Sequence, residues 1–157
     1  MATIKKKPSG YGQFGGFSPY GNVTALAFFL ATNASGAVID SDTTVAVASG
    51  DVIDLGELPE GMRLDDAQIL IKTGMTATVI GSLGFKYVDG DSTEVPQDAA
   101  YFINAGDLAT AGRLRANTGK LVTLPKAARL ILTTGGAANA KASDIKVIVS
   151  GELTGPR

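Results

Sequence analysis

The run Asp144-Ile145-Lys146-Val147-Ile148-Val149-Ser150-Gly151-Glu152-Leu153 decides the fold class of this chain. Apolar side chains recur at alternate positions, so that one face carries Ile145, Val147, Val149 and Leu153. The opposite face is mostly polar, with Asp144, Lys146, Ser150 and Glu152. Because successive side chains point to opposite faces of a strand, this pattern predicts a half-buried strand in an antiparallel sheet.

The same alternation extends outward along the chain. Residues 76–88 place on one face the side chains of Ala77, Val79, Leu83, Phe85 and Tyr87. Gly81 and Gly84 predict a bulge or bend in this strand, and Asp89-Gly90-Asp91 predicts the turn after it. Shorter apolar runs lie at residues 38–39, 43–48, 51–55, 66–73, 120–124 and 128–133. Together these segments predict about nine strands.

A weak internal duplication favours two layers of strands. Residues 55–74 and 121–135 each contain a strand, a Leu-Pro pair that ends it, a second strand and a Thr-Gly turn. Two such halves fit two Greek keys, so we expect an all-β, jelly-roll-like antiparallel β-sandwich over residues 22–157. Only residues 96–117 lack the pattern. There we expect at most one short helix, capped by Asp107 and running through Leu108, Ala111 and Leu114.

Residues 22–32 are apolar on both faces of their predicted strand. One face carries Ala25, Ala27 and Phe29. The other carries Leu26, Phe28 and Leu30. A strand of this kind is either central in a sheet or covered by another chain. We therefore expect Leu26, Phe28 and Leu30 to pack between protomers.

Residues 1–21 form a separate unit, which we expect to be an extended N-terminal arm. Glycine and proline recur in it and prevent a helix or a ladder. Four aromatic residues fall at every third position, at Tyr11, Phe14, Phe17 and Tyr20. That spacing places them on one side of a polyproline-like chain. Two interpretations stay open: a disordered tail with incidental aromatic residues, or an arm that becomes ordered on a partner surface.

The composition excludes most enzyme classes. The 157 residues fit one globular domain, and they include no Cys, His or Trp. A chain without His or Cys has no Ser-His-Asp triad, no thiol nucleophile and no ordinary zinc, haem or iron–sulfur site. The net charge of −1 argues against general binding to nucleic acid or membranes. We therefore expect no catalysis, no cofactor and no bound metal.

The N-terminal charges and the first apolar run imitate a secretory signal. Lys5, Lys6 and Lys7 precede the apolar residues 25–31. The Gly- and aromatic-rich residues 9–21 separate the two features, so we expect no cleavage. The chain has no apolar run of ~18 residues, so we expect no membrane-spanning helix.

The remaining catalytic motifs are weak. Residues 10–15 match the dinucleotide pattern G-x-G-x-x-G, but no strand precedes them, and Gly16 and Pro19 prevent a helix after them. Asp65 and Asp66 are adjacent, so in a strand they point to opposite faces and cannot share a substrate.

Acidic residues in the predicted turns leave two alternatives open. The fold can bring together some of the carboxylates of Asp40, Asp42, Asp51 and Asp54, although solvated turn residues are the simpler interpretation. Calcium fits the ligand type of Asp89, Asp91 and Glu94, although the twelve-residue loop pattern is absent and turn chemistry accounts for these residues.

Several strand ends and turns resemble a known family. They read DVIDLGELPEGMRL at 51–64, GFKYVDGD at 84–91, YF at 101–102, LVTLP at 121–125 and IKVIVSG at 145–151. These segments are similar to capsid cement or decoration proteins of tailed bacteriophages. The resemblance covers roughly residues 38–153 and leaves the arm outside. It implies a jelly-roll-like β-sandwich that binds mature capsid shells in many copies, as dimers or trimers, and it implies no catalytic residues.

From the resemblance and the arm we expect a structural virion protein, synthesised in the host cytoplasm and located on the outer capsid surface. Its partners would be the major capsid protein and further copies of itself, as a homodimer or homotrimer, without a membrane or a specific nucleic acid. Lys5, Lys6 and Lys7 would contact acidic residues of the shell, and the four aromatic side chains of the arm would fill grooves on a neighbour. Many such contacts on one shell add up to high avidity.

Two functions of other classes remain open. One is a receptor- or glycan-binding module of a phage tail or spike, which would need exposed aromatic side chains as a platform. The other is an enzyme acting on polysaccharide, which would need two carboxylates facing each other across a cleft.

Overall fold

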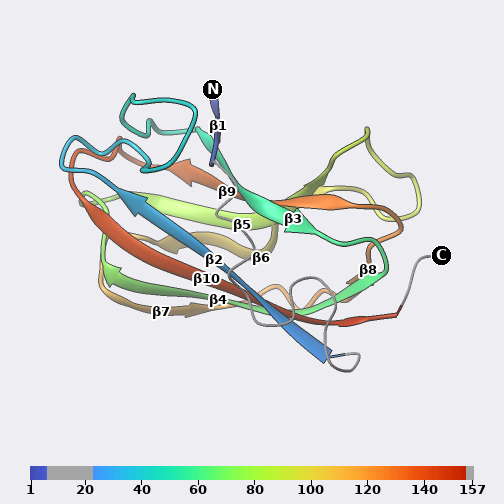
Figure 1. Ribbon diagram of the computed structural model, residues 1–157. Coiled ribbons are helices and arrows are strands. Elements are labelled where there is room, and N and C mark those ends of the chain that lie inside the picture. Colours follow the sequence, from blue (N-terminus) through green and yellow to red (C-terminus); the bar gives the residue numbers. More distant parts are fainter. Residues whose placement is uncertain (7–22, 155–157) are drawn as a thin grey trace.

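The computed structural model describes residues 1–6 and 23–154, and these residues form two packed β-sheets (Figure 1). The first sheet contains, in order, β1 (Thr3–Lys5), β3 (Val52–Leu58), β9 (Ala128–Gly135), β5 (Ile80–Tyr87) and β6 (Asp98–Asp107). The second contains β2 (Val23–Thr32), β10 (Ser143–Leu153), β4 (Met62–Thr73) and β7 (Gly112–Arg115), and the short β8 (Val122–Thr123) pairs with β4. Every strand pair is antiparallel except β1 with β3. The predicted jelly-roll-like β-sandwich is therefore confirmed.

The strand over 143–153 lies inside its sheet, as its alternation predicts. β10 pairs along its length with β2 on one side and with β4 on the other. Ile145, Val147 and Val149 are buried, and the intervening side chains are half-buried on the outer face. Alternating side chains thus divide this strand between the core and the surface.

The two Leu-Pro segments form matching corners between the sheets. β3 in the first sheet leads through Leu58 to β4 in the second, and β8 in the second leads through Leu124 to β9 in the first. The corners also pair with each other, since β3 pairs with β9 and β4 with β8. Both leucine side chains are completely buried. The weak duplication in the sequence therefore corresponds to two related corners of the sandwich.

Four aromatic side chains pack edge to face in the core near β5 and β6. The ring centroids of Phe85 and Tyr101 are 5.4 Å apart, and those of Tyr101 and Phe102 are 4.7 Å apart. Tyr87 extends this group from Phe85 at 5.6 Å. Edge-to-face pairs of this kind add to the stabilisation that the rings gain from burial.

Glycines set the close approach of β5 to β6. The pairing of the two strands shifts register between Gly81 and Leu83 and again between Leu83 and Phe85. A Cβ atom on Gly84 would lie 2.0 Å from the carbonyl oxygen of Asp98. The irregularity that Gly81 and Gly84 predict is therefore present, and Gly84 is needed for space at this approach.

The prediction of a short helix near Asp107 is wrong. Residues 98–107 form β6, and 112–115 form β7; the described residues contain no helix, and hence none that could cross a membrane. Asp107 Oδ1 instead accepts the N–H of Ala109, 2.8 Å away, and closes a turn. β6 shows no alternation because Tyr101, Phe102 and Ile103 are all buried in succession.

The segment 43–48 also differs from its prediction. It is a loop rather than a strand, with only an isolated bridge between Ala37 and Ala46. The bridges from Thr32 to Val38 and from Lys6 to Ser41 fix the rest of this long connection between β2 and β3. Val47 of this segment is buried, whereas Val45 is exposed, and an alternation over so few residues does not distinguish a loop from a short strand.

Candidate interaction surfaces

The start of the predicted arm lies in the first sheet. β1 pairs in parallel with β3, with Thr3 opposite Val52 and Lys5 opposite Asp54. On its other side, Lys5 N–H donates to Asp42 Oδ1 at 3.0 Å, and Asp42 N–H donates to Lys5 O at 3.0 Å. The β1 backbone is therefore held from both sides, by the edge of β3 and by the loop containing Asp42.

The side chains of β1 divide between the core and the surface. Ile4 is 3% exposed and belongs to the core cluster, whereas Lys5 is exposed. Burial lowers the pKa of Lys6, and the negative charge of Asp40 opposes this effect. Of the residues predicted to contact a shell, Lys5 is held by its backbone with its side chain exposed, and Lys6 is half-buried against this chain. The others lie outside the described residues: Lys7, Tyr11, Phe14, Phe17 and Tyr20.

The strand predicted to pack between protomers turns two of its three side chains into the domain. Leu26 and Leu30 are 3% and 0% exposed and belong to the core. Phe28 is half-buried beside Gly56 of β3, where a Cβ atom would come within 2.6 Å of its ring. The burial of Leu26 and Leu30 therefore requires no second protomer, and packing of Phe28 between protomers stays a prediction.

The opposite side of β2 contributes an exposed apolar side chain to the outer face of the second sheet. Phe29 is 54% exposed, and the Nζ atom of Lys146 lies 5.2 Å from its ring centroid. Lys146 also lies opposite Leu70 of β4, and Ile148 is the next side chain of β10 on the same face. Leu70 and Ile148 are half-buried. Phe29, Ile148 and Leu70 thus place apolar side chains from three strands on the outer face of this sheet.

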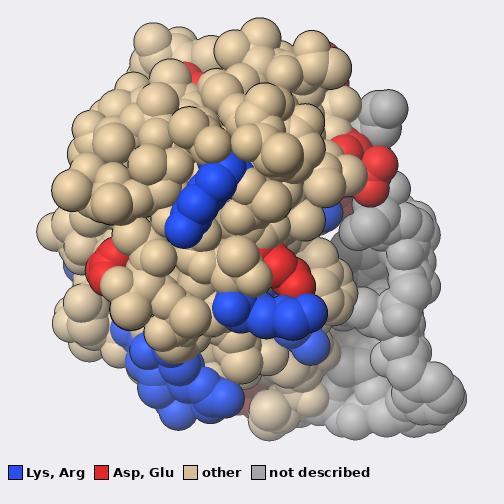
Figure 2. Space-filling view, turned by 90° about the vertical axis from the view of Figure 1, so that its left-hand side faces the viewer, with Lys and Arg blue, Asp and Glu red and all other residues tan. Residues whose placement is uncertain are grey.

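One end of the sandwich carries very little charge. It is built from four loops at the left of Figure 1, residues 33–50, 74–79, 108–111 and 136–142. Their only charged residues are Asp40, Asp42 and Lys141. Figure 2 looks onto this end, and its upper part is almost free of charged side chains. Ile39 and Val45 are exposed there, at 44% and 69%. This surface, named here the neutral end, has the depletion of charge that is typical of interface cores.

Buried Asn139 holds the neutral end together. Its Nδ2 donates to Thr32 Oγ1 at 3.0 Å and to Lys141 O at 2.9 Å. Its Oδ1 accepts the N–H and the hydroxyl of Thr76, at 3.0 and 3.2 Å. Its own N–H donates to Val47 O at 2.8 Å. Asn139 thus joins segments that are far apart in the sequence, through its side chain and its backbone N–H, and it fixes their relative positions.

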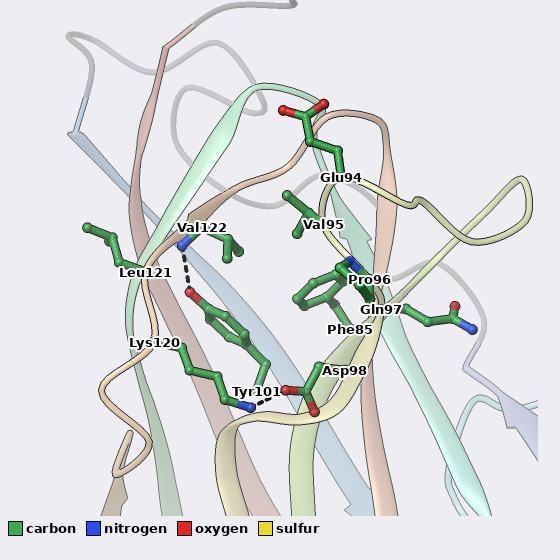
Figure 3. A pocket seen from close by; sticks show the side chains of 10 residues that line it. All are labelled: Phe85, Glu94, Val95, Pro96, Gln97, Asp98, Tyr101, Lys120, Leu121 and Val122. Carbon is green, nitrogen blue, oxygen red and sulfur yellow. Dashed lines mark hydrogen bonds and ion pairs between the residues drawn. The ribbon is translucent and has the colours of Figure 1, made fainter.

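A shallow depression of about 500 Å³ lies at the other end of the sandwich (Figure 3). Residues 94–98 form one wall, residues 120–122 form the other, and Phe85 and Tyr101 lie between them. Tyr101 is 3% exposed, and its hydroxyl accepts the N–H of Val122 at 3.0 Å and donates to Leu64 O at 3.2 Å. Burial raises the pKa of Tyr101. The hydroxyl therefore joins the 120–122 wall to β4, and the buried ring presents little surface to a ligand.

The charged pair in this depression is unsuited to acid catalysis. Partial burial by itself would raise the pKa of Asp98, but bonds from Lys120 Nζ and the N–H of Ala100 lower it below its usual value. A general acid requires a carboxyl with a raised pKa. Asp98 therefore acts as the ionised partner of Lys120.

The turn considered for calcium already holds a cation from the chain. Lys126 Nζ donates to the carbonyl oxygens of Asp89 and Asp91, the latter at 3.0 Å. Asp91 Oδ1 accepts the N–H groups of Gln97 and Ser92, and these bonds lower the pKa of Asp91. Among residues 1–6 and 23–154, no three acidic side chains lie close enough to hold a metal ion.

The exposed aromatic surface is also small. Of the six aromatic side chains in the described part of the chain, Phe29 alone is exposed, and Phe28 is half-buried. The aromatic residues near the depression belong to the core. Sugar-binding modules typically stack a sugar on exposed rings, and the depression has no such platform.

Neither the protein-family models nor the curated proteins include a match to this sequence. Solved structures do share its fold. A chain from the capsid of Ralstonia phage GP4 aligns with a TM-score of 0.66 and 17% identity, covering 99% of both chains. A chain from the cyanophage Pam1 capsid asymmetric unit aligns with a TM-score of 0.57 and 17% identity, over 86% of this chain and 88% of that one.

A third match comes from the acidic stable capsid structure of Helicobacter pylori bacteriophage KHP30. Its TM-score is 0.51 at 14% identity, and it covers 83% of this chain and 89% of that one. At these identities the matches establish similarity of fold. The jelly-roll-like sandwich formed by this sequence is thus a fold that also occurs in chains of three phage capsid structures.

Proposed function

We propose that this protein is a structural component of a tailed-phage virion, and that it binds the outer capsid surface and cements neighbouring subunits without catalysis. The observation that carries the proposal is the end-to-end match to a chain of the Ralstonia phage GP4 capsid, over 99% of both chains. A match of this extent spans the whole sandwich rather than one part of it. The resemblance of the strand ends and turns to capsid cement proteins supports the same role.

The chemistry of the surface supports adhesion rather than turnover. Arg129 Nε donates to both carboxylate oxygens of Asp54, at 3.0 Å each. Lys120 Nζ forms an ion pair with Asp98. Both carboxylates thus have a cationic partner within the chain. The neutral end offers apolar and small side chains for contact. We therefore assign the neutral end to contact with the major capsid protein.

Substitution in the neutral end tests this assignment. The variant Val45→Asp is added to capsid shells prepared without the protein. We expect it to occupy about tenfold fewer sites than the wild type, because the substitution places a charge in a water-excluding contact. Val45 is 69% exposed, so the substitution should leave the unfolding midpoint unchanged. The matched control is Val88→Asp, because Val88 is 62% exposed after β5, away from the neutral end. Equal occupancy for the two variants would disprove contact through the neutral end.

The N-terminal arm is proposed to add a second contact with a neighbouring subunit. Deleting the arm outright is a poor test, because the deletion also removes β1 and buried Ile4. Serine should instead replace its four aromatic residues, Tyr11, Phe14, Phe17 and Tyr20. Because a tethered second contact increases avidity, we expect occupancy to fall by at least about tenfold.

The measurement is the number of copies bound per shell, determined by gel densitometry and by electron microscopy of the particles. The arm variant keeps residues 1–6, so its unfolding midpoint should equal that of the wild type. Full occupancy by the arm variant would leave the aromatic residues without a role in attachment. Absence of the wild-type protein from purified particles would overturn the proposed function as a whole.

A further inference from the structure

β1 occupies a slot that is built by distant parts of the chain. One wall is the edge of β3, and the other is the loop around Asp42. At the start of the slot, Asp51 accepts the N–H of Ala2 at 3.0 Å on Oδ1 and the N–H of Ala48 at 2.9 Å on Oδ2. Val52 N–H donates to Ala2 O at 3.0 Å. The bonds from Ala2 to Lys5 thus fix a short extended peptide by its backbone.

The side chain of Ile4 gives the slot its specificity. Ile4 is 3% exposed and packs with the core cluster, while Thr3 and Lys5 on either side are exposed. Alternate side chains therefore point into the domain and out to solvent, as in peptides that add a strand to a sheet edge. An acidic side chain at position 4 would be buried without a partner.

The connection from the slot to the rest of the fold is long. Residues 7–22 separate Lys6 from Val23, the first residue of β2. At about 3.3 Å per residue, this length of chain spans at most about 55 Å. It is therefore long enough to reach the slot of an adjacent copy of a domain this size.

We propose that residues 2–6 are exchanged between copies, so that the N-terminal strand of one protomer fills the slot between β3 and the Asp42 loop of another. A strand from a second copy makes the same hydrogen bonds and buries the same isoleucine as a strand from the same chain. The contacts in the slot therefore contribute the same free energy whether the strand comes from the same chain or from another copy. The local concentration of neighbouring copies then decides which strand binds. Copies crowded on a common surface become linked through their N-termini.

This exchange concerns contacts among copies of the chain alone. It holds in solution at high protein concentration whether or not the protein attaches to a capsid. Failure of the exchange would leave the proposed shell contact intact, and failure of shell binding would leave the exchange intact.

Engineered cysteines test the exchange directly, because the natural sequence contains no cysteine. Thr3 lies opposite Val52 in the β1–β3 register, and paired positions of this kind are close enough for a disulfide. Thr3→Cys and Val52→Cys are placed in separate full-length chains, mixed at about millimolar concentration and oxidised mildly. We expect a covalent dimer with a disulfide between position 3 of one chain and position 52 of the other, identified by mass spectrometry of the digested dimer.

Two further variants make the result decisive. The double variant Thr3→Cys/Val52→Cys, oxidised at high dilution, should form the bond within one chain; if it does not, the slot itself is misassigned and the proposal is overturned. Adding Ile4→Asp to the Thr3→Cys chain should abolish the mixed dimer, because its strand no longer seats in the core. If the double variant oxidises within one chain while the mixture yields no dimer linked between positions 3 and 52, the strand does not exchange.

Discussion

Asn139→Ala is expected to lower the free energy of unfolding by about 3 kcal/mol. Asn139 is 1% exposed, and its side chain donates to Thr32 Oγ1 and Lys141 O and accepts from two groups of Thr76. Alanine would leave the N–H of Thr76 without this acceptor. Each buried polar group that loses its partner costs about 1–3 kcal/mol, and here several are affected together.

Urea unfolding followed by circular dichroism measures this loss. The matched control is Asn104→Ala, because Asn104 is exposed and accepts a single long bond, 3.4 Å from Ser82 Oγ. The control should stay within about 0.5 kcal/mol of the wild type. The interpretation of Asn139 as the link among the loops would be wrong if both variants unfolded at the same urea concentration.

The Asn139 substitution also connects stability to the proposed contact surface. The Asn139 side chain joins the end of β2 at Thr32 to Thr76 and Lys141 in two loops of the neutral end, and alanine would keep only the backbone bond from position 139 to Val47. A surface held in one conformation loses less entropy on binding. We therefore expect Asn139→Ala to lower shell occupancy even under conditions in which the variant remains folded.

The strand pattern could be predicted from the sequence wherever one face of a strand is buried and the other exposed. β10 and most of β5 have this property, and their alternation predicts both strands. The sequence does not predict β6, because buried neighbours on both faces, such as Tyr101 and Phe102, remove the alternation. The two-residue alternation of apolar side chains reflects the alternation of burial. It therefore does not identify a strand in which both faces are buried.

The interaction surfaces depend on contacts between distant residues, which one sequence does not contain. Asn139 lies in the run GGAANAKAS, which has the composition of an ordinary turn. Thr3–Lys5 is too short to stand out beside the three lysines that overlap and follow it. Exposed Phe29 and buried Leu26 share a strand that is apolar on both faces, so its sequence does not reveal which side faces the core. In each of these cases the role of the residue depends on which distant segments it contacts in the fold.

Gly84→Ala is expected to lower the free energy of unfolding by at least about 3 kcal/mol, or to prevent folding. The added Cβ would lie 2.0 Å from Asp98 O and 2.4 Å from the carbonyl carbon of Ala99. Both atoms belong to the backbone of β6, so no side chain can rotate away. Relief requires β6 to move from β5, and this separates Phe85 from Tyr101 in the core.

The control for this substitution is Gly135→Ala in β9 of the same sheet. Its added Cβ would meet only a side chain, at 3.2 Å from Ile80 Cγ1, and Ile80 is partly exposed and can shift. We expect a change of less than about 1 kcal/mol there, measured by the same urea unfolding. Because both positions lie in strands of one sheet, propensity alone predicts similar effects for the two alanines. A large difference in unfolding free energy between the two variants would therefore report the backbone contact between β5 and β6. Equal unfolding midpoints would show that β6 can move away from β5 without loss of stability, and that its close approach does not stabilise the sandwich.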